Sequence, residues 1–221
     1  MRGVIITVAN SKGGTGKTLL AVHLAAWLER RGSQVALVDA DAQGSSGAWA
    51  AEALPDVPCE AIHDARGLAR RLPELAEAFE AVIVDGPAGL AEQTRALLLV
   101  GDLAVIPVCP SVGDLRAARL AVDVLTDARA VRRDGKPGAL LVLNRYQGHT
   151  RLSRECLEAA ATLGVPVAKQ PVRQLQAYAD AVGQGQTVFT MGAAADGAAD
   201  DLRRLFPEVI AWQSDERQRT R

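Results

Sequence analysis

The sequence predicts an α/β fold, a doubly wound and mostly parallel sheet with helices on both faces. Two observations predict it. Short, nearly continuous apolar runs alternate with longer segments whose apolar residues recur every three or four positions, as strands and helices do in a wrapped parallel sheet. Several of these runs end in glycine or polar residues, at the edge where such sheets bind ligands. The 221 residues suffice for one such domain.

The strands are expected on the apolar runs. They cover residues 4–9, 34–39, 57–62, 81–85, 103–108 and 139–144. Apolar residues occupy nearly every position of the first run, which is typical of a parallel strand that is covered on both faces. The segments between the strands are long enough for helical crossovers, which keep consecutive strands parallel.

The helices are expected between and after these strands. They cover residues 18–31, 64–79, 91–100, 111–132, 150–163, 174–182 and 193–206. In the first helix, Leu20 and Leu24 belong to an apolar stripe, and Gly32 supplies the stop. Asp64 is the candidate N-cap of the second helix, which is expected to break at Pro73. Pro207 is expected to end the last helix.

A glycine-rich loop separates the first strand from the first helix. Its sequence is Lys12-Gly13-Gly14-Thr15-Gly16-Lys17-Thr18. A strand that reopens as a helix through glycines turns backbone N–H groups toward one point, where the helix dipole adds positive charge. The loop therefore predicts a phosphate cradle, in which Lys17 reaches the terminal phosphates and the Thr18 hydroxyl ligates Mg²⁺. An ordinary P-loop has glycine at position 11, whereas this chain has Ser11 followed by a second lysine, Lys12.

Carboxylates follow two of the expected strands. Asp39 and Asp41 belong to the run Asp39-Ala40-Asp41-Ala42-Gln43-Gly44, and Asp85 ends the strand at residues 81–85. A strand-end aspartate is the usual second magnesium anchor of P-loop ATPases, so Asp85 is a candidate metal residue. For the run that contains Asp39 and Asp41, an aspartate-capped turn is the alternative. Asn144 ends a later strand.

Together these motifs resemble the ParA/MinD family of P-loop ATPases, and most closely its small ParA proteins without an N-terminal DNA-reading domain. The glycine-rich loop resembles the family's deviant Walker A box, KGGxGK[ST]. Residues 39–44 resemble its DxDxQG switch, and residues 85–89 its D-x-P-P-G switch, with Ala88 replacing the second proline. Leu19 stands where the family usually has a second hydroxyl. The resemblance covers residues 1–210.

The resemblance implies a role for each matched residue. The family's first lysine reaches the partner subunit's nucleotide, which implies that role for Lys12. Asp41 would orient the attacking water, and Asp39 would give structural or magnesium-shell support. Asn144 would pair with adenine. The implied cofactors are ATP and Mg²⁺, the implied activity is slow, partner-stimulated ATP hydrolysis, and the implied assembly is a homodimer that forms with ATP. The nucleotide-binding residues would be Gly13, Gly14, Thr15, Gly16, Lys17, Thr18 and Asn144.

Charge is uneven along the chain, although the net charge is −1. Nine basic and three acidic residues lie between Arg129 and Arg173, as binding to a polyanion would need. Small ParA-like proteins bind DNA without sequence preference, so nonspecific DNA is the expected surface, and an ordinary solvated surface is the alternative. The candidate DNA-binding residues are Arg145, Arg151, Arg154, Lys169 and Arg173. A ParB-like protein or a cargo adaptor would stimulate hydrolysis.

The resemblance thus implies an ATP-dependent dimerising switch that partitions or positions DNA or a cellular cargo through nucleotide-gated binding to nonspecific DNA. Two other functions compete with this hypothesis. A MinD-like membrane switch could use residues 202–206, which mix basic and bulky apolar residues, but Pro207 and Glu208 are expected to interrupt that segment. Membrane binding is therefore not expected. A metabolic P-loop enzyme of the dethiobiotin synthetase type would have a similar size and fold, but would not need Lys12.

The resemblance implies one P-loop ATPase domain over residues 1–210, and the polar, charged end of the chain predicts a frayed tail over residues 211–221. No apolar stretch reaches the roughly 18 residues of a membrane span, and the start of the chain leads directly into a strand, so no signal peptide is expected. Cys59, Cys109, Cys156, His23, His63 and His149 are scattered without metal-ligand spacing. The expected location is cytoplasmic, with nucleoid association in the ATP-bound state.

Overall fold

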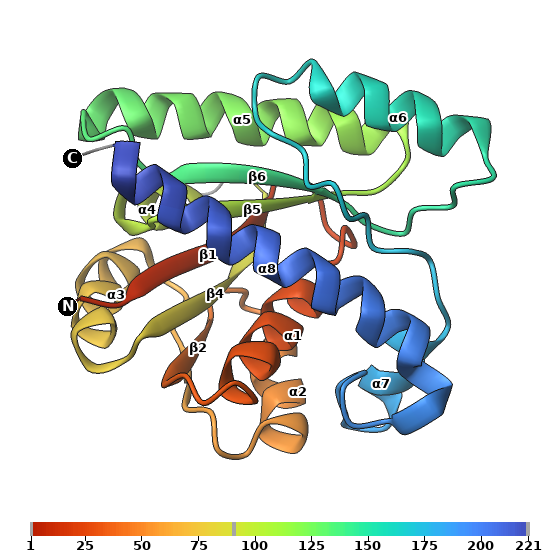
Figure 1. The fold of residues 1–221 in the computed structure, drawn as a ribbon. Coiled ribbons are helices and arrows are strands. Elements are labelled where there is room, and N and C mark those ends of the chain that lie inside the picture. Colours follow the sequence, from red (N-terminus) through yellow and green to blue (C-terminus); the bar gives the residue numbers. More distant parts are fainter. Residues whose placement is uncertain (1, 90–91, 220–221) are drawn as a thin grey trace.

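The computed structural model describes residues 2–89 and 92–219, with side chains up to residue 211. One six-stranded sheet has the strand order β3-β2-β4-β1-β5-β6, and neighbouring strands pair in parallel. The strands are β1 (Val4–Asn10), β2 (Val35–Asp39), β3 (Cys59–Ala61), β4 (Ala81–Ala88), β5 (Leu103–Val108) and β6 (Gly138–Leu143). The predicted doubly wound sheet is confirmed (Figure 1).

Helices cover both faces of the sheet (Figure 1). One face carries α1 (Lys17–Glu29), α2 (Ser45–Ala53), α7 (Ala177–Gly183) and α8 (Asp196–Arg219), with the short 3₁₀ helix η1 (Gly192–Ala195) before α8. The other face carries α3 (Ala65–Ala78), α4 (Glu92–Val100), α5 (Val112–Arg132) and α6 (Arg151–Ala161). Successive residues of β1 point to opposite faces of the sheet. Ile6 packs in the core on the side of α1 and α8, and Ile5 in the core on the side of α3 and α4.

The helix prediction was wrong at two prolines and at one segment. Pro73 lies inside α3 and Pro207 inside α8, so neither breaks its helix. Leu205 and Val209, on either side of Pro207, are at most 1% exposed, and such burial offsets the hydrogen bond that a proline removes. Helix α2 was not predicted, because its serine, glycine and alanine residues give no clear apolar stripe.

The other boundaries lie within three residues of the expectations. β4 continues to Ala88, past the expected end at Asp85, because Ala88 still pairs with β1, and α7 begins at Ala177 instead of residue 174. Asp64 caps α3, since its Oδ1 accepts a hydrogen bond from the Gly67 N–H at 2.7 Å. Ala91 is the expected first residue of the helix that follows the fourth strand, and it lies outside the described residues. Helix α8 continues to Arg219, and the division between a domain of residues 1–210 and a frayed tail stays a prediction.

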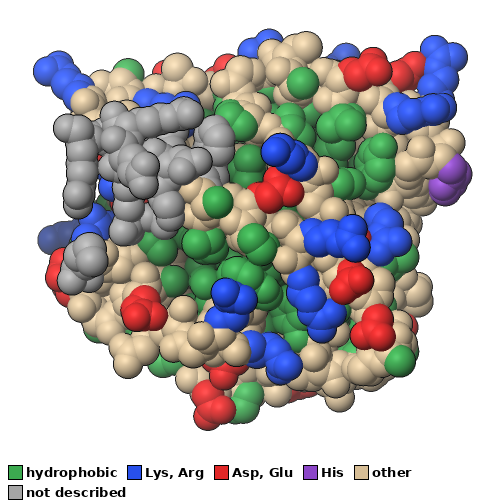
Figure 2. Space-filling view, viewed as in Figure 1, with side chains coloured by type: hydrophobic (Ala, Val, Ile, Leu, Met, Phe, Trp, Pro, Cys, Tyr) green, Lys and Arg blue, Asp and Glu red, His purple; other side chains and the backbone are tan. Residues whose placement is uncertain are grey.

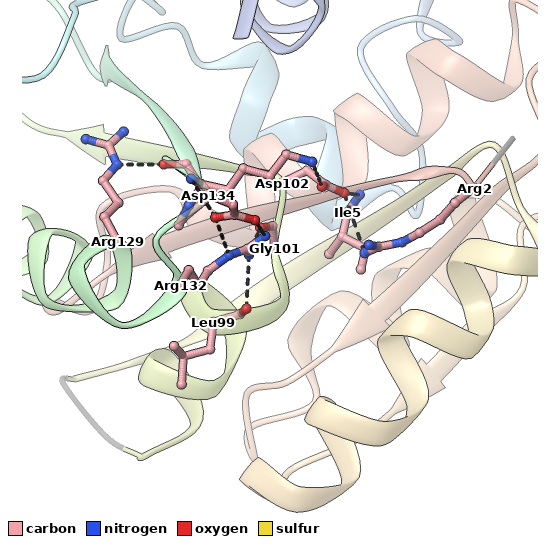
Figure 3. A network of polar contacts seen from close by, with 10 residues as sticks. Arg2, Ile5, Leu99, Gly101, Asp102, Arg129, Arg132 and Asp134 are labelled. Carbon is pink, nitrogen blue, oxygen red and sulfur yellow. Dashed lines mark hydrogen bonds and ion pairs between the residues drawn. The ribbon is translucent and has the colours of Figure 1, made fainter. Parts of the chain in front are cut away.

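A polar network holds the amino-terminal edge of the sheet (Figure 3). The Asp102 carboxylate, next to β5, accepts hydrogen bonds from the Ile5 N–H at 2.9 Å and from Lys136 Nζ at 2.8 Å. Arg132 at the end of α5 donates to the carbonyls of Leu99 and Gly101. These contacts tie β1, β5 and the α5–β6 connection together at the edge opposite the carboxyl ends of the strands.

Helix α1 is joined to the carboxyl-terminal part of the chain through His23. The buried imidazole contacts the Leu19 carbonyl with Nδ1 at 2.8 Å and accepts the Val188 N–H with Nε2 at 3.1 Å. Three aromatic rings meet it edge-on, those of Trp49, Tyr178 and Phe189. Burial lowers the pKa of His23 to about 4. The imidazole is therefore neutral in the folded protein at ordinary pH.

We expect His23 to make the folded protein less stable as the pH falls from 6.5 to about 4. In that range the unfolded chain binds a proton at His23 that the folded chain does not, and the free energy of unfolding should fall by about 3 kcal/mol in all. Urea denaturation at several pH values would measure this, with His23→Gln as the reference variant.

The reference variant is needed because Asp85 changes the free energy of unfolding with pH in the opposite direction to His23. Burial raises the pKa of Asp85 to about 6, so its carboxyl binds a proton more readily in the folded state, and stability is lost as the pH rises toward 6. The stability difference between the wild type and His23→Gln removes this contribution. A difference that did not change between pH 7 and pH 4 would contradict a neutral, buried His23.

Candidate functional site

The predicted nucleotide-binding residues lie at the carboxyl edge of the sheet. In the register of β1 with β4, Val8 lies opposite Asp85, and in that of β2 with β4, Asp39 lies opposite Asp85. The glycine-rich loop begins directly after β1. Because parallel strands end at the same edge, the structure brings together motifs that are far apart in the sequence.

Glycines determine the path of the loop. Gly16 has a φ of 97°, and a Cβ atom there would lie 2.0 Å from Nδ2 of Asn144. Gly14 has a φ of 74°. Both angles lie in the left-handed region that glycine adopts without strain. The loop then enters α1 at Lys17, where the first N–H groups of the helix have no partner within it. This backbone fits the predicted phosphate cradle.

Lys17 points inward at the start of α1. Its side chain is buried, and Nζ donates a hydrogen bond to the carbonyl oxygen of Lys12 at 3.2 Å. Burial lowers the pKa of Lys17, while the nearby carboxylates of Asp85 and Asp41 raise it. The ammonium group therefore lies in the curve of the loop, close to both carboxylates.

Thr18 and Asp85 fit a magnesium site. The Thr18 hydroxyl donates a hydrogen bond to Asp85 Oδ2 at 2.7 Å. The other oxygen of Asp85, Oδ1, is buried and makes no hydrogen bond of ordinary geometry with the described residues, although the nearby Ser46 hydroxyl helps to lower the pKa of this carboxyl. Burial raises the pKa of Asp85 to about 6, and the Thr18 hydrogen bond partly opposes that rise. A buried carboxylate oxygen without a hydrogen bond of ordinary geometry calls for an explanation, and a hard cation beside a hydroxyl provides one.

Asp39 and Asp41 differ in their surroundings. Asp39 is buried, and its two oxygens accept hydrogen bonds from the N–H groups of Asp41 at 3.1 Å and Gly47 at 2.8 Å. Asp39 thus holds the turn that leads into α2, as its predicted structural role requires, while its role near magnesium stays a prediction. Asp41 is half-buried, and its Oδ1 accepts the Gln43 N–H at 3.0 Å.

The head of the loop is attached to α5. Lys12 Nζ lies 2.7 Å from Asp114 Oδ2, and the Ser11 hydroxyl donates to the Ala117 carbonyl at 3.0 Å. Sequence reasoning missed Asp114. The spacing of Ser111 and Asp114 indicates a capped helix start, but nothing in the sequence indicates a contact with a lysine 102 positions away.

A cavity of about 540 Å³ lies beside the loop and α1, a volume that suits a nucleoside-sized ligand. Trp49 and Tyr178 line it, and neither was predicted to belong to the site. Asn144 also lines it, but Nδ2 of Asn144 donates to the Thr15 carbonyl at 2.7 Å. The amide therefore braces the loop in this structure, and its pairing with adenine stays a prediction.

The residues predicted to bind DNA have different surroundings. Arg145 and Arg173 both line the cavity. Arg173 also pairs with the buried Asp201 at 2.9 Å, which restricts it. On α6, Arg151 pairs with Glu155 at 2.6 Å. Arg154 on α6 and Lys169 after β6 are exposed. The structure therefore brings Arg145 and Arg173 to the cavity beside the glycine-rich loop.

Comparison with known proteins identifies the family. Residues 6–188 match the CobQ/CobB/MinD/ParA nucleotide binding domain. The maintenance of carboxysome distribution protein A of Halothiobacillus neapolitanus is 35% identical over 210 residues, which cover 93% of this chain and 95% of that protein. The chromosome-partitioning ATPase Soj of Thermus thermophilus is 28% identical over 237 residues, with coverage of 93% and 95%.

A solved structure shows the same fold. The complex of a variant of Cyanothece McdA with ATP has a TM-score of 0.78 at 18% identity, and the match covers 96% of this chain and 97% of that one. The family match extends over more than half of the chain, from β1 to beyond α7. This protein therefore belongs to the ParA/MinD group of nucleotide-binding domains.

Proposed function

We propose that this protein is an ATPase that dimerises with ATP and distributes a cellular cargo along nonspecific DNA. One observation carries the proposal: the carboxyl edge of the sheet brings Lys17, the Thr18–Asp85 pair and Asp41 together around one loop. A phosphate cradle, a metal anchor and a carboxylate beside the phosphates are the parts that ATP hydrolysis requires.

Phosphoryl transfer needs mainly positioning and charge stabilisation. The loop N–H groups and the start of α1 would hold the phosphates, with Lys17 neutralising their charge. Bound Mg²⁺, held through Thr18 and Asp85, would supply charge stabilisation on the phosphate oxygens. Asp41 would orient the attacking water. Lys12 would neutralise charge on the nucleotide of the partner subunit, which links hydrolysis to assembly.

The curated relatives suggest the kind of cargo. The relative at 35% identity is named for carboxysome distribution, and the one at 28% for chromosome partitioning. The greater identity favours a carboxysome or a comparable protein body over a chromosome. An adaptor on that cargo, or a ParB-like protein, would stimulate hydrolysis.

Burial in α8 argues against a membrane anchor at residues 202–206, and nonspecific DNA stays the proposed surface. Leu202, Leu205 and Phe206, which a membrane anchor at residues 202–206 would need, are at most 1% exposed. The expected interruption at Pro207 was wrong, since α8 continues through it; burial of the apolar side chains keeps this segment from a membrane instead. In the described part of the chain, no helix is both long and apolar enough to cross a bilayer.

Charge on the molecular surface is mixed. Figure 2 shows lysine and arginine side chains interspersed with acidic ones on one face. DNA binding by a single subunit would therefore be weak, and alignment of basic residues in a dimer would strengthen it. A metabolic enzyme is the competing function, and it would consume a small co-substrate in proportion to ATP.

Lys17→Ala should abolish ATP binding. The variant removes the buried ammonium from the curve of the loop, and phosphate binding should weaken by about 100-fold or more because a charge-assisted contact in a desolvated site is lost. Equilibrium titration with a fluorescent ATP analogue would measure the affinity. Affinity within about threefold of the wild type would rule out the phosphate cradle.

Asp41→Ala should keep ATP-dependent dimerisation and lose hydrolysis. Asp41 contacts the backbone of its own turn and lies close to Lys17, so its loss should lower turnover by about 100-fold without preventing nucleotide binding. Phosphate release and sedimentation velocity would be measured on the same sample. Turnover at the wild-type rate would remove Asp41 from the mechanism.

The double variant Arg151→Gln/Arg154→Gln should weaken DNA binding with ATP. Loss of two phosphate contacts should reduce the slope of log affinity against log salt by about 2. The matched control is Arg66→Gln/Arg70→Gln, which removes two exposed arginines from α3. Fluorescence anisotropy with unrelated duplexes at several salt concentrations would measure both. An equal loss in the two double variants would show that net charge, and not α6, governs binding.

A further inference from the structure

The contact between Lys12 and Asp114 has a consequence for dimerisation. Lys12 is the residue that must leave its own subunit in the proposed function, yet its ammonium group lies 2.7 Å from Asp114 Oδ2 within the same chain. The side chain of Lys12 is 47% exposed and that of Asp114 only 6%. The lysine is therefore accessible to solvent, while the carboxylate that binds it is fixed in the protein.

Asp114 is held firmly by its surroundings. It lies in the first turn of α5, where its N–H donates to the hydroxyl of the N-cap Ser111 at 3.0 Å. The Ser111 hydroxyl is also hydrogen-bonded to Asp114 Oδ2, the same oxygen that contacts Lys12. The carboxylate thus has a fixed position and a cation partner in the single subunit.

The backbone on the other side of the contact is held as well. The Ser11 hydroxyl donates to the Ala117 carbonyl, one turn further along α5, and the Lys12 N–H donates to Asn10 Oδ1 at 3.0 Å. Because both ends are fixed, only the flexible side chain of Lys12 needs to move in order to break the ion pair.

We propose that Asp114 is a positioning residue that holds Lys12 within its own subunit until a second loaded subunit takes the lysine. The two contacts exclude one another, because the ammonium group cannot remain on Asp114 and also reach a phosphate across an interface. For each contact that Lys12 makes with the partner subunit's phosphates, dimerisation then breaks one Lys12–Asp114 ion pair. It leaves the nearly buried Asp114 carboxylate without its cation. Such a loss weakens the dimer. This inference rests on the proposed function.

The test measures the protein concentration at half-dimerisation. Sedimentation velocity would be run with a non-hydrolysable ATP analogue and, as a blank, with ADP. Asp114→Asn keeps the shape of the side chain and its hydrogen bond with Ser111, but removes the charge. It should lower the half-dimerisation concentration by about three- to tenfold, as expected for one partly exposed ion pair. Asp123→Asn removes the same charge from an exposed position of α5 and should leave that concentration unchanged.

A double-mutant cycle separates the proposed hold of Asp114 on Lys12, here called the latch, from a general structural effect of the substitution. In a Lys12→Gln background, Asp114→Asn should have no effect on the half-dimerisation concentration, because no lysine remains to be released. If Asp114→Asn fails to fold, Asp114→Ser repeats the measurement with a smaller neutral residue. Unchanged or weaker dimerisation in the folded Asp114 variant would overturn the latch, and so would an equal gain in the Lys12→Gln background.

The failure of the latch and the failure of the proposed function give different results. If the wild type stays monomeric with the analogue at every concentration, the dimerising function is wrong. If the wild type dimerises and Lys12→Gln dimerises more weakly, while Asp114→Asn behaves as the wild type does, only the proposed role of Asp114 is wrong.

Discussion

The parallel register between β1 and β4 is the constraint on which the site depends. It places Asp85 opposite Val8, beside the strand that leads into the glycine-rich loop. Side chains alternate between the faces of a strand, and a shift of one residue would turn Asp85 to the other face and separate it from Thr18. The apolar cores on both faces fix that register. The same shift would move the Val82 and Val84 side chains out of the core in which they pack and onto the opposite face of the sheet.

Burial at this edge gives the site its chemistry. The same low dielectric raises the pKa of Asp85 to about 6 and lowers the pKa of Lys17, because each charge is removed from water. Binding of a divalent cation would favour the ionised form of Asp85, and polyphosphate would favour the charged form of Lys17. In the proposed function, the binding of nucleotide with magnesium would therefore be coupled to the protonation of both residues.

The sequence was sufficient for features that depend on local pattern. The apolar runs that became β1 and β4, the glycines of the loop and Asp85 in β4 all carry their signal within a few residues. Helix α2 carried no such signal, since its main buried anchor, Trp49, is surrounded by small residues. Pro207 was misinterpreted because local propensity was outweighed by burial of the residues on both sides of it.

Long-range contacts between side chains could not be predicted in the same way. Asp114 contacts Lys12 only because β5 lies beside β1 in the sheet, which places the start of α5 next to the loop. That placement also resolves a conflict within the loop itself. Two lysines five positions apart would repel each other if both ammonium groups lay in the cradle. Instead Lys17 turns inward to a backbone carbonyl, and Lys12 turns outward to α5. Lys12 is thus kept out of the phosphate site of its own subunit. It stays available to the phosphate site of a partner subunit.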